Sequence, residues 1–189
     1  MTPEDEAARL EERLNAEAPL IDREVQWPGL RLRQRTYLAG PALPDVLITS
    51  IRAVVFRRGR VVVIRERTGP PHVTPGGRRE VGEALETTLR RELREECGWS
   101  VGELRPLAFH HFYYLGEKPP GFAYPWRPFV QPIFVVEALA YDRTCLKRGD
   151  EIETGASLMS VRRALNTVPG DQQTILQAAL DLHRRHPPA

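Results

Sequence analysis

Residues 77–99 read GRREVGEALETTLRRELREECGW, and this stretch decides the fold. Acidic side chains crowd its second half, where Glu92, Glu95 and Glu96 are spaced by three and four residues. On a helix such spacings project the carboxylates from one narrow arc, where like charges repel unless a cation lies between them. The divalent ions Mg²⁺ and Mn²⁺ prefer oxygen ligands of this kind, so we expect one of them to bind here.

A helix over residues 83–97 is predicted to carry these acids beside its buried face. At about 100° per residue, Glu95 and Glu96 lie near −60° and +40° from Glu92. The leucines of the segment lie between about +20° and +100° on the same wheel: Leu85, Leu89 and Leu93. The side expected to face water carries Thr87, Arg90 and Arg94. Gly98 is a normal signal for the end of a helix.

An ordinary salt-bridged surface helix is the alternative interpretation of this segment. The pairs at four-residue spacing are Glu86 with Arg90 and Arg91 with Glu95. Such pairs stabilise many exposed helices. This alternative leaves Glu92 and Glu96 as a like-charged pair, and it does not explain the glycines that precede the helix.

The rest of the chain predicts strands on both sides of this helix. Alternating or continuous apolar residues indicate strands over residues 30–38, 46–56, 61–64, 104–114 and 129–141. Helical periodicity indicates helices over residues 4–17, 161–165 and 171–184, and residues 116–128 and 148–155 are expected to be loops. Strands before and after one helix, with another helix at the end, predict an α/β sandwich whose mixed sheet is covered on both faces.

The strand at residues 30–38 alternates apolar residues with arginines, as a half-buried strand does. We expect it to lie at the solvated edge of a sheet. The alternative is that its arginine face contacts phosphate groups.

The composition is that of a globular protein with one catalytic domain. The 189 residues are 41% hydrophobic and 28% charged. We expect a helix and strand extension over residues 1–40 and the catalytic domain over residues 41–189. The extension could pack on the domain or on a second subunit, which would suit a homodimer. No apolar run is long enough to span a membrane and the N-terminus lacks the pattern of a secretory signal, so we expect a cytoplasmic location.

The cysteine count and the net charge exclude further classes. Cys97 and Cys145 are the two cysteines, without a CxxC pair, which argues against a zinc ribbon or a disulfide framework. The net charge of +2 gives no argument for nucleic-acid binding through bulk electrostatics.

The glutamate segment resembles the signature of the Nudix hydrolases, the MutT-like enzymes, which reads G-x5-E-x7-R-E-U-x-E-E-x-G-U with U a bulky apolar residue. The matching positions are Gly77, Glu83, Arg91, Glu92, Leu93, Glu95, Glu96, Gly98 and Trp99. A chance match at a given start has a probability on the order of 10⁻⁹ at average residue frequencies. The resemblance implies a Nudix-type α/β/α sandwich with a mixed sheet, to which this chain adds its N-terminal helix and strand.

The resemblance also implies a metal site. Glu92, Glu95 and Glu96 correspond to the family's catalytic ligands of Mg²⁺ or Mn²⁺. Gly76, just before the motif, is expected to offer its backbone carbonyl as another ligand.

Four further positions correspond to residues that support the family's site. Glu83 and Arg91 correspond to a structural ion pair in which the arginine helps to orient the acids. Gly77 and Gly98 correspond to the residues that shape the turn into the helix and the exit from it.

The implied reaction is hydrolysis of the pyrophosphate bond in a nucleoside diphosphate linked to another moiety, such as a nucleotide, a sugar or a dinucleotide polyphosphate. The general base could be one of the three glutamates or an acid from another loop, for which we favour Glu153 over Glu151. An inactive nucleotide-sensing or regulatory domain is a second hypothesis, although it would be expected to have lost one of the glutamates. An RNA-cap hydrolase is a third, since arginines in residues 31–35 and 57–60 could hold a phosphate backbone.

Aromatic residues beyond the helix are candidates for stacking on the base of a small nucleotide substrate. They are Tyr113, Tyr114, Phe122, Tyr124 and Trp126. We select Tyr114 and Trp126 as substrate-binding residues, against the alternative that these rings pack in the core or at a sheet edge. His110 and His111 would point to opposite faces of a strand, so at most one of them is expected to line the pocket.

Overall fold

The computed structural model describes residues 2–40, 42–67, 69–122, 126–147 and 153–185, without the side chains of Glu66, Glu153 and Thr154. The helices are α1 (Pro3–Leu14), α2 (Leu85–Cys97), α3 (Val161–Leu165) and α4 (Gly170–Arg185), and short 3₁₀ helices cover Asp45–Leu47 and Arg143–Cys145. The strands are β1 (Ile21–Trp27), β2 (Leu30–Leu38), β3 (Arg52–Arg57), β4 (Arg60–Glu66), β5 (Trp99–Val101), β6 (Arg105–Leu115), β7 (Phe129–Tyr141) and β8 (Glu153–Ser160).

The chain divides into two compact units. One comprises Met1–Thr49 and Ala108–Pro132, and the other comprises Ser50–Leu107 and Ile133–Ala189. Both β6 and β7 contribute residues to each unit.

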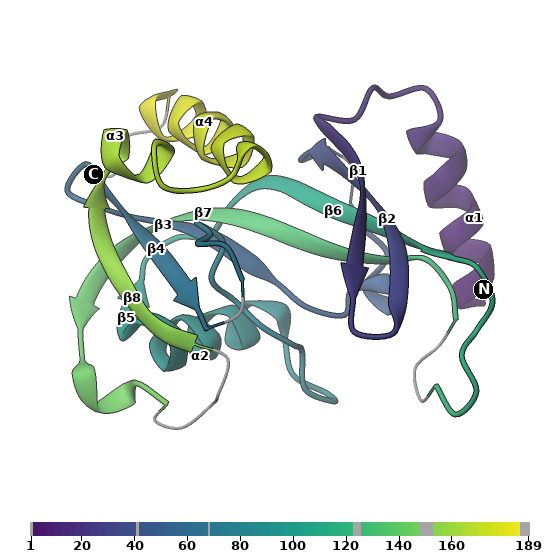
Figure 1. The fold of residues 1–189 in the computed structure, drawn as a ribbon, viewed down its shortest axis with the longest axis horizontal. Coiled ribbons are helices and arrows are strands. Elements are labelled where there is room, and N and C mark those ends of the chain that lie inside the picture. The colour runs from purple at the N-terminus through teal and green to yellow at the C-terminus, as the bar shows by residue number, and fades with distance from the viewer. Residues whose placement is uncertain (1, 41, 68, 123–125, 148–152, 186–189) are drawn as a thin grey trace. The chain divides into compact units, whose positions relative to one another are not determined.

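The second unit has the sandwich architecture expected from the sequence. Its strands are ordered β7-β3-β4-β8, with β3 parallel to β7 and the other pairs antiparallel. Figure 1 shows these strands between α2 on one side and α3 and α4 on the other. The expected mixed sheet, covered on both faces by helices, is therefore confirmed.

Alternation along β3 explains how this sheet holds a helix on each face. Ala53 and Val55 belong to the buried cluster that contains Leu89 and Leu93 of α2. Phe56, the residue after Val55, points to the other face and stacks on His183 of α4, with the two ring centroids 4.5 Å apart. Burial of each large apolar side chain contributes about 1.5–3 kcal/mol. The two leucines therefore anchor α2 and fix the direction of its acidic arc.

Helix α2 begins at Leu85, slightly later than expected, and ends where expected. Gly98 follows it with φ +73°, a left-handed conformation that glycine adopts readily, and its N–H donates to the Arg94 carbonyl at 3.0 Å. On the side expected to face water, Thr87 and Arg94 are exposed and Arg90 is partly exposed. Arg90 is half-buried because its guanidinium donates to the carbonyls of Val101 and Gly102 as well as pairing with Glu86.

The first unit contains the expected N-terminal helix and strand. A capping box starts α1, in which the Asp5 N–H donates to Thr2 Oγ1 at 3.1 Å and the Thr2 N–H donates to Asp5 Oδ2 at 2.8 Å. The apolar face of α1 joins a buried cluster with residues of strands and of the 3₁₀ helix Asp45–Leu47 in the same unit: Ala7, Leu10, Leu14, Tyr37, Leu47, Phe109 and Val130. Helix α1 is thus packed on its own unit.

The expectation that residues 30–38 form an edge strand was wrong. Strand β2 lies between β1 and β6 and pairs antiparallel with both. Asp22 on β1 forms ion pairs with Arg33 and Arg35. These arginines, which were expected to be solvated at a sheet edge, therefore have an acidic partner on the neighbouring strand. Strand β1 was not predicted, because its sequence IDREVQW is mostly charged or polar.

Other elements also differ from the sequence prediction. Strand β3 starts at Arg52, because Asp45–Leu47 forms a 3₁₀ turn instead of extended chain. Strand β8 includes residues 153–155, which were expected to be loop, and it pairs antiparallel with β4. The short strand β5 was not predicted.

Within the described residues, no helix combines the length and the apolar character needed to cross a membrane.

Candidate metal centre

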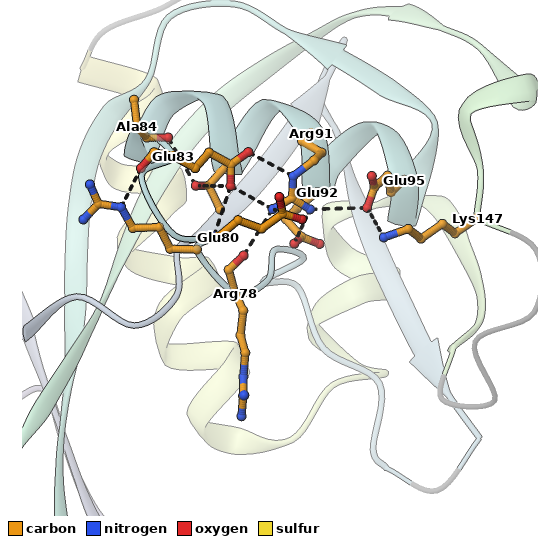
Figure 2. A network of polar contacts seen from close by, with 10 residues as sticks. Arg78, Glu80, Glu83, Ala84, Arg91, Glu92, Glu95 and Lys147 are labelled. Carbon is orange, nitrogen blue, oxygen red and sulfur yellow. Dashed lines mark hydrogen bonds and ion pairs between the residues drawn. The ribbon is translucent and has the colours of Figure 1, made fainter. Parts of the chain in front are cut away.

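Arg91 lies at the middle of a network of carboxylates on and before α2. Figure 2 shows its guanidinium between Glu83 on one side and Glu92 and Glu95 on the other, with Lys147 beyond Glu95. The arginine side chain is 23% exposed, so water screens these contacts only in part. The network therefore holds several charged groups of the signature together.

Glu83 is bound more completely than any other acid in this network. Arg91 donates to both of its carboxylate oxygens, from Nε at 3.0 Å and from Nη2 at 2.9 Å, and Thr88 Oγ1 donates to Oε2 at 2.8 Å. The arginine and these hydrogen bonds lower the pKa of Glu83 to about 2. Glu83 is consequently a carboxylate across the physiological range, and its contacts fix the orientation of Arg91. The part played by Thr88 could not be seen in the sequence, because a helical threonine carries no specific signal.

The opposite side of Arg91 contacts two of the expected metal ligands. Its Nη1 lies 2.7 Å from Glu92 Oε1 and 3.4 Å from Glu95 Oε2. Hydrogen bonding to Glu83 and Glu92 raises the pKa of Arg91, which stays cationic. Arg91 thus reduces the repulsion between the two glutamates at neutral pH.

The third expected ligand, Glu96, contacts the glycine loop before the helix. Its Oε2 accepts a hydrogen bond from the Gly76 N–H at 2.7 Å. The loop itself is tied to the start of β3, because Ile51 N–H donates to the Gly77 carbonyl at 3.0 Å and Ala53 N–H donates to the Pro75 carbonyl at 2.9 Å. The structure therefore brings Gly76 and Glu96 together beside the start of β3.

Gly77 leaves room for a glutamate. A methyl group added at this residue would overlap the carboxylate of Glu92. At Gly76 an added methyl group would overlap the Ile51 carbonyl oxygen and would lie 2.8 Å from the Arg52 Cα, and φ there is +137°. The two glycines thus have different roles. Gly76 lets the loop pass close to the backbone at the start of β3, and Gly77 leaves space for the Glu92 side chain.

A residue of α4 that the sequence did not single out also holds this loop. The buried Gln172 accepts hydrogen bonds at Oε1 from the Val73 N–H at 3.0 Å and from Thr74 Oγ1 at 3.4 Å. These bonds fix the backbone shortly before Gly76. Only the tertiary structure reveals this role, since Gln172 lies about a hundred residues from its partners.

Lys147 is a second cation beside the acids that was not predicted. Its Nζ lies 2.6 Å from Glu95 Oε2, and its backbone N–H donates to the Glu95 carbonyl at 3.0 Å. The ion pair raises the pKa of Lys147.

The glutamates supply donors of the right chemistry for a hard divalent ion, although their present contacts are with other groups. As the described side chains stand, no group of three acidic, histidine or cysteine residues is arranged to hold a metal. The reason is visible in the contacts above: Glu92 and Glu95 bind the cations Arg91 and Lys147, and Glu96 binds the Gly76 N–H. Two carboxylates compensated by cations and a third bound to a backbone N–H fit a site where Mg²⁺ or Mn²⁺ takes over that role.

The two candidates for a separate general base fall at the margin of the described structure. Glu153 is the first residue of β8, where its backbone pairs with Glu66 of β4, and its side chain lies outside the described part. Glu151 lies outside the described residues altogether. The role of Glu153 stays a prediction.

The candidate substrate residues Tyr114 and Trp126 belong to the first unit. Their rings stack on each other with centroids 4.0 Å apart, and Phe122 contacts both rings edge-on. Tyr124 lies outside the described residues. The short distance leaves no room for a base between the two rings, so only an outer face of the pair could stack on one.

His110 and His111 lie in β6 and are both buried. His110 Nδ1 is 2.8 Å from Thr36 Oγ1, whereas neither ring nitrogen of His111 has a hydrogen-bond partner among the described residues. Burial, with the nearby charge of Arg35, lowers the pKa of His111 to about 4. His111 is therefore neutral at pH 7.

Comparison with known proteins agrees with this geometry. The sequence model of the NUDIX domain matches residues 47–177. No curated protein sequence matches the chain.

Several solved structures share the fold. The pyrophosphohydrolase BsRppH of Bacillus subtilis is 16% identical with a TM-score of 0.57, over 87% of this chain and 98% of its own. A NUDIX hydrolase from Nitrosomonas europaea is 17% identical with a TM-score of 0.53, over 73% and 90%. A NUDIX-family hydrolase from Clostridium perfringens is 16% identical with a TM-score of 0.50, over 70% and 95%. At these identities the likeness is one of fold.

Proposed function

Because this chain belongs to the Nudix family of hydrolases, we propose that it hydrolyses the pyrophosphate bond of a nucleoside diphosphate linked to another moiety, with Mg²⁺ or Mn²⁺ as cofactor. The substrate is a small nucleotide derivative. The observation that carries the proposal is the gathering of the signature acids around Arg91 and the glycine loop.

Each acid has a distinct part in the proposal. Glu92, Glu95 and Glu96, with the Gly76 carbonyl, hold the divalent ion, which when bound neutralises pyrophosphate charge and lowers the pKa of a water molecule. Glu83 is kept from that role by its two bonds to Arg91, and it positions the arginine instead. Arg91 in turn orients Glu92 and Glu95 from the opposite side.

A general base has to accept the proton of the attacking water. We propose Glu153 for this step, because the three signature glutamates are engaged as ligands. The location of its backbone at the start of β8, in the same unit as α2, supports this choice. The proposal requires that Glu153→Gln lowers kcat strongly; turnover at the wild-type level would return the role to one of the three ligands.

The base of the substrate is proposed to stack on the outer face of the Tyr114–Trp126 pair. Stacking on aromatic side chains contributes about 1–3 kcal/mol per base and tolerates any base. Alanine at Trp126 should therefore raise KM more than it lowers kcat. An unchanged KM across all substrates would leave the two rings as packing residues only.

A hydrolysis assay on a substrate panel tests the proposed reaction. The panel contains nucleoside diphosphate sugars, dinucleoside polyphosphates, oxidised nucleoside triphosphates and a capped RNA, each with Mg²⁺ and with Mn²⁺, and products are identified by mass spectrometry. We expect turnover of at least one small nucleotide and a loss of about 10²-fold or more in kcat for Glu96→Gln, because a ligand oxygen is lost.

Glu86→Gln is the matched control for that variant. Glu86 is a glutamate of the same helix, exposed and paired with Arg90 rather than with the network. It should retain wild-type turnover. If no panel member is hydrolysed by the wild type, the proposal is wrong and a nucleotide-sensing role takes its place; turnover of the capped RNA alone would identify an RNA-cap hydrolase.

A further inference from the structure

Lys147 is attached to the proposed ligand Glu95 at two points. Its backbone N–H donates to the Glu95 carbonyl in the last turn of α2 at 3.0 Å, and its ammonium group lies 2.6 Å from Glu95 Oε2. Figure 2 shows the lysine side chain reaching this carboxylate from the side opposite Arg91. The backbone bond keeps the ammonium group within reach of Glu95 even when the ion pair is broken.

The ammonium group contacts one of the two Glu95 oxygens that a metal ion could use. Divalent ions such as Mg²⁺ contact their oxygen ligands at about 2.1 Å. A cation already 2.6 Å from Glu95 Oε2 repels a second, doubly charged cation at that oxygen. Glu95 is 22% exposed and Lys147 is 58% exposed, so water screens this repulsion in part.

Arg91 also contacts Glu95 Oε2, but it does not compete in the same way. Its contact is longer, at 3.4 Å, and its guanidinium keeps two bonds to Glu83 when it gives up Glu95. Lys147 differs, because Glu95 is its one ion-pair partner among the described residues. When a metal ion binds the Glu95 carboxylate, Lys147 therefore loses this ion pair, whereas Arg91 keeps its bonds to Glu83.

We propose that Lys147 is an internal competitor of the divalent ion at Glu95 and so sets the metal affinity of the free protein. The proposal rests on the proposed function, since it takes Glu95 as a ligand. Metal binding requires the lysine to leave Glu95, and the ion pair forms again when the metal dissociates. Without metal, Lys147 neutralises part of the negative charge of the glutamates. It also raises the concentration of metal needed for activity.

Binding of Mn²⁺ alone, followed by electron paramagnetic resonance in the absence of substrate, tests this proposal. We expect Lys147→Met to bind Mn²⁺ about three- to tenfold more tightly, the effect of one removed, partly exposed competing cation. Lys147→Arg keeps a cation at the same place and should bind Mn²⁺ as the wild type does. Arg143→Met removes one charge from the same segment, where Arg143 is exposed, and should also leave the affinity unchanged.

The outcomes separate this proposal from the proposed function. Equal Mn²⁺ affinities for the wild type and Lys147→Met, with hydrolysis intact in both, would overturn the competitor and leave the hydrolase. An equal gain in Arg143→Met would overturn it as well, since bulk charge would then explain the effect. Absence of both Mn²⁺ binding and hydrolysis in the wild type would overturn the hydrolase itself. Thermal denaturation of each variant without metal verifies that it is folded.

Discussion

Alanine at Gly77 should mainly lower activity, whereas alanine at the adjacent Gly76 should mainly lower stability. At Gly77 the new methyl group overlaps the Glu92 carboxylate, which is the end of a flexible side chain. The carboxylate can withdraw by about 1 Å to restore normal van der Waals contact, so the free energy of unfolding should fall by less than about 1 kcal/mol. The same displacement moves a proposed metal ligand, and a misplacement of about 1 Å can cost about 10²-fold in rate.

At Gly76 the same methyl group meets backbone instead. It overlaps the Ile51 carbonyl oxygen, lies 2.8 Å from the Arg52 Cα, and requires alanine to adopt φ +137°. The unfavourable backbone conformation costs about 1–3 kcal/mol and the overlap with β3 about as much again, so the free energy of unfolding should fall by about 2–6 kcal/mol.

Urea denaturation followed by tryptophan fluorescence measures the stability of both variants, and the hydrolysis assay measures their activity. We expect Gly77→Ala to be nearly as stable as the wild type and at least tenfold less active, whereas Gly76→Ala unfolds at clearly lower urea. The reasoning is refuted if Gly77→Ala has full activity, or if Gly76→Ala is as stable as the wild type.

Three further predictions concern Arg91, Gln172 and His111. Arg91→Met leaves Glu83 without its two charged hydrogen bonds and should lower both kcat and the thermal midpoint, while Arg94→Met on the exposed side of α2 should change neither. Gln172→Met removes the acceptor that holds Val73 and Thr74, and it should weaken Mn²⁺ binding. Gln172→Glu keeps an acceptor oxygen and should restore most of the Mn²⁺ affinity. Equal Mn²⁺ binding in both variants would argue against a positioning role for Gln172. The pKa of His111 is about 4 in the folded protein, against 6.5 for the free side chain. As the pH falls, the unfolded chain therefore binds a proton at this residue before the folded protein does. The free energy of unfolding should consequently decrease by about 1.4 kcal/mol per pH unit between pH 6 and 4. Urea midpoints across that range should show a smaller decrease in His111→Phe, and an identical slope would contradict the assignment.

The sequence predicted the parts of the site that depend on local spacing. The positions of Glu92, Glu95 and Glu96 follow from helical periodicity, and the helix they lie on was set by its leucines and by Gly98. Local geometry of this kind does not need knowledge of the rest of the fold.

The contacts that complete the site come from distant segments, which no local pattern in the sequence reveals. Gln172 and Lys147 are polar residues of ordinary type, and only tertiary contacts select them from the other polar residues. Periodicity also failed for β1 and β8, since IDREVQW and ETGASLMS alternate too little in hydropathy to indicate a strand. Their pairing with β2 and β4 stabilises them in place of an apolar pattern.

Anomalous diffraction from a crystal soaked in Mn²⁺ tests the central claim most directly. We expect one or more manganese peaks within about 2.5 Å of carboxylate oxygens of Glu92, Glu95 and Glu96 and of the Gly76 carbonyl, with Lys147 withdrawn from Glu95. A crystal without manganese at these oxygens, in which Arg91 and Lys147 still hold the glutamates, would contradict the account.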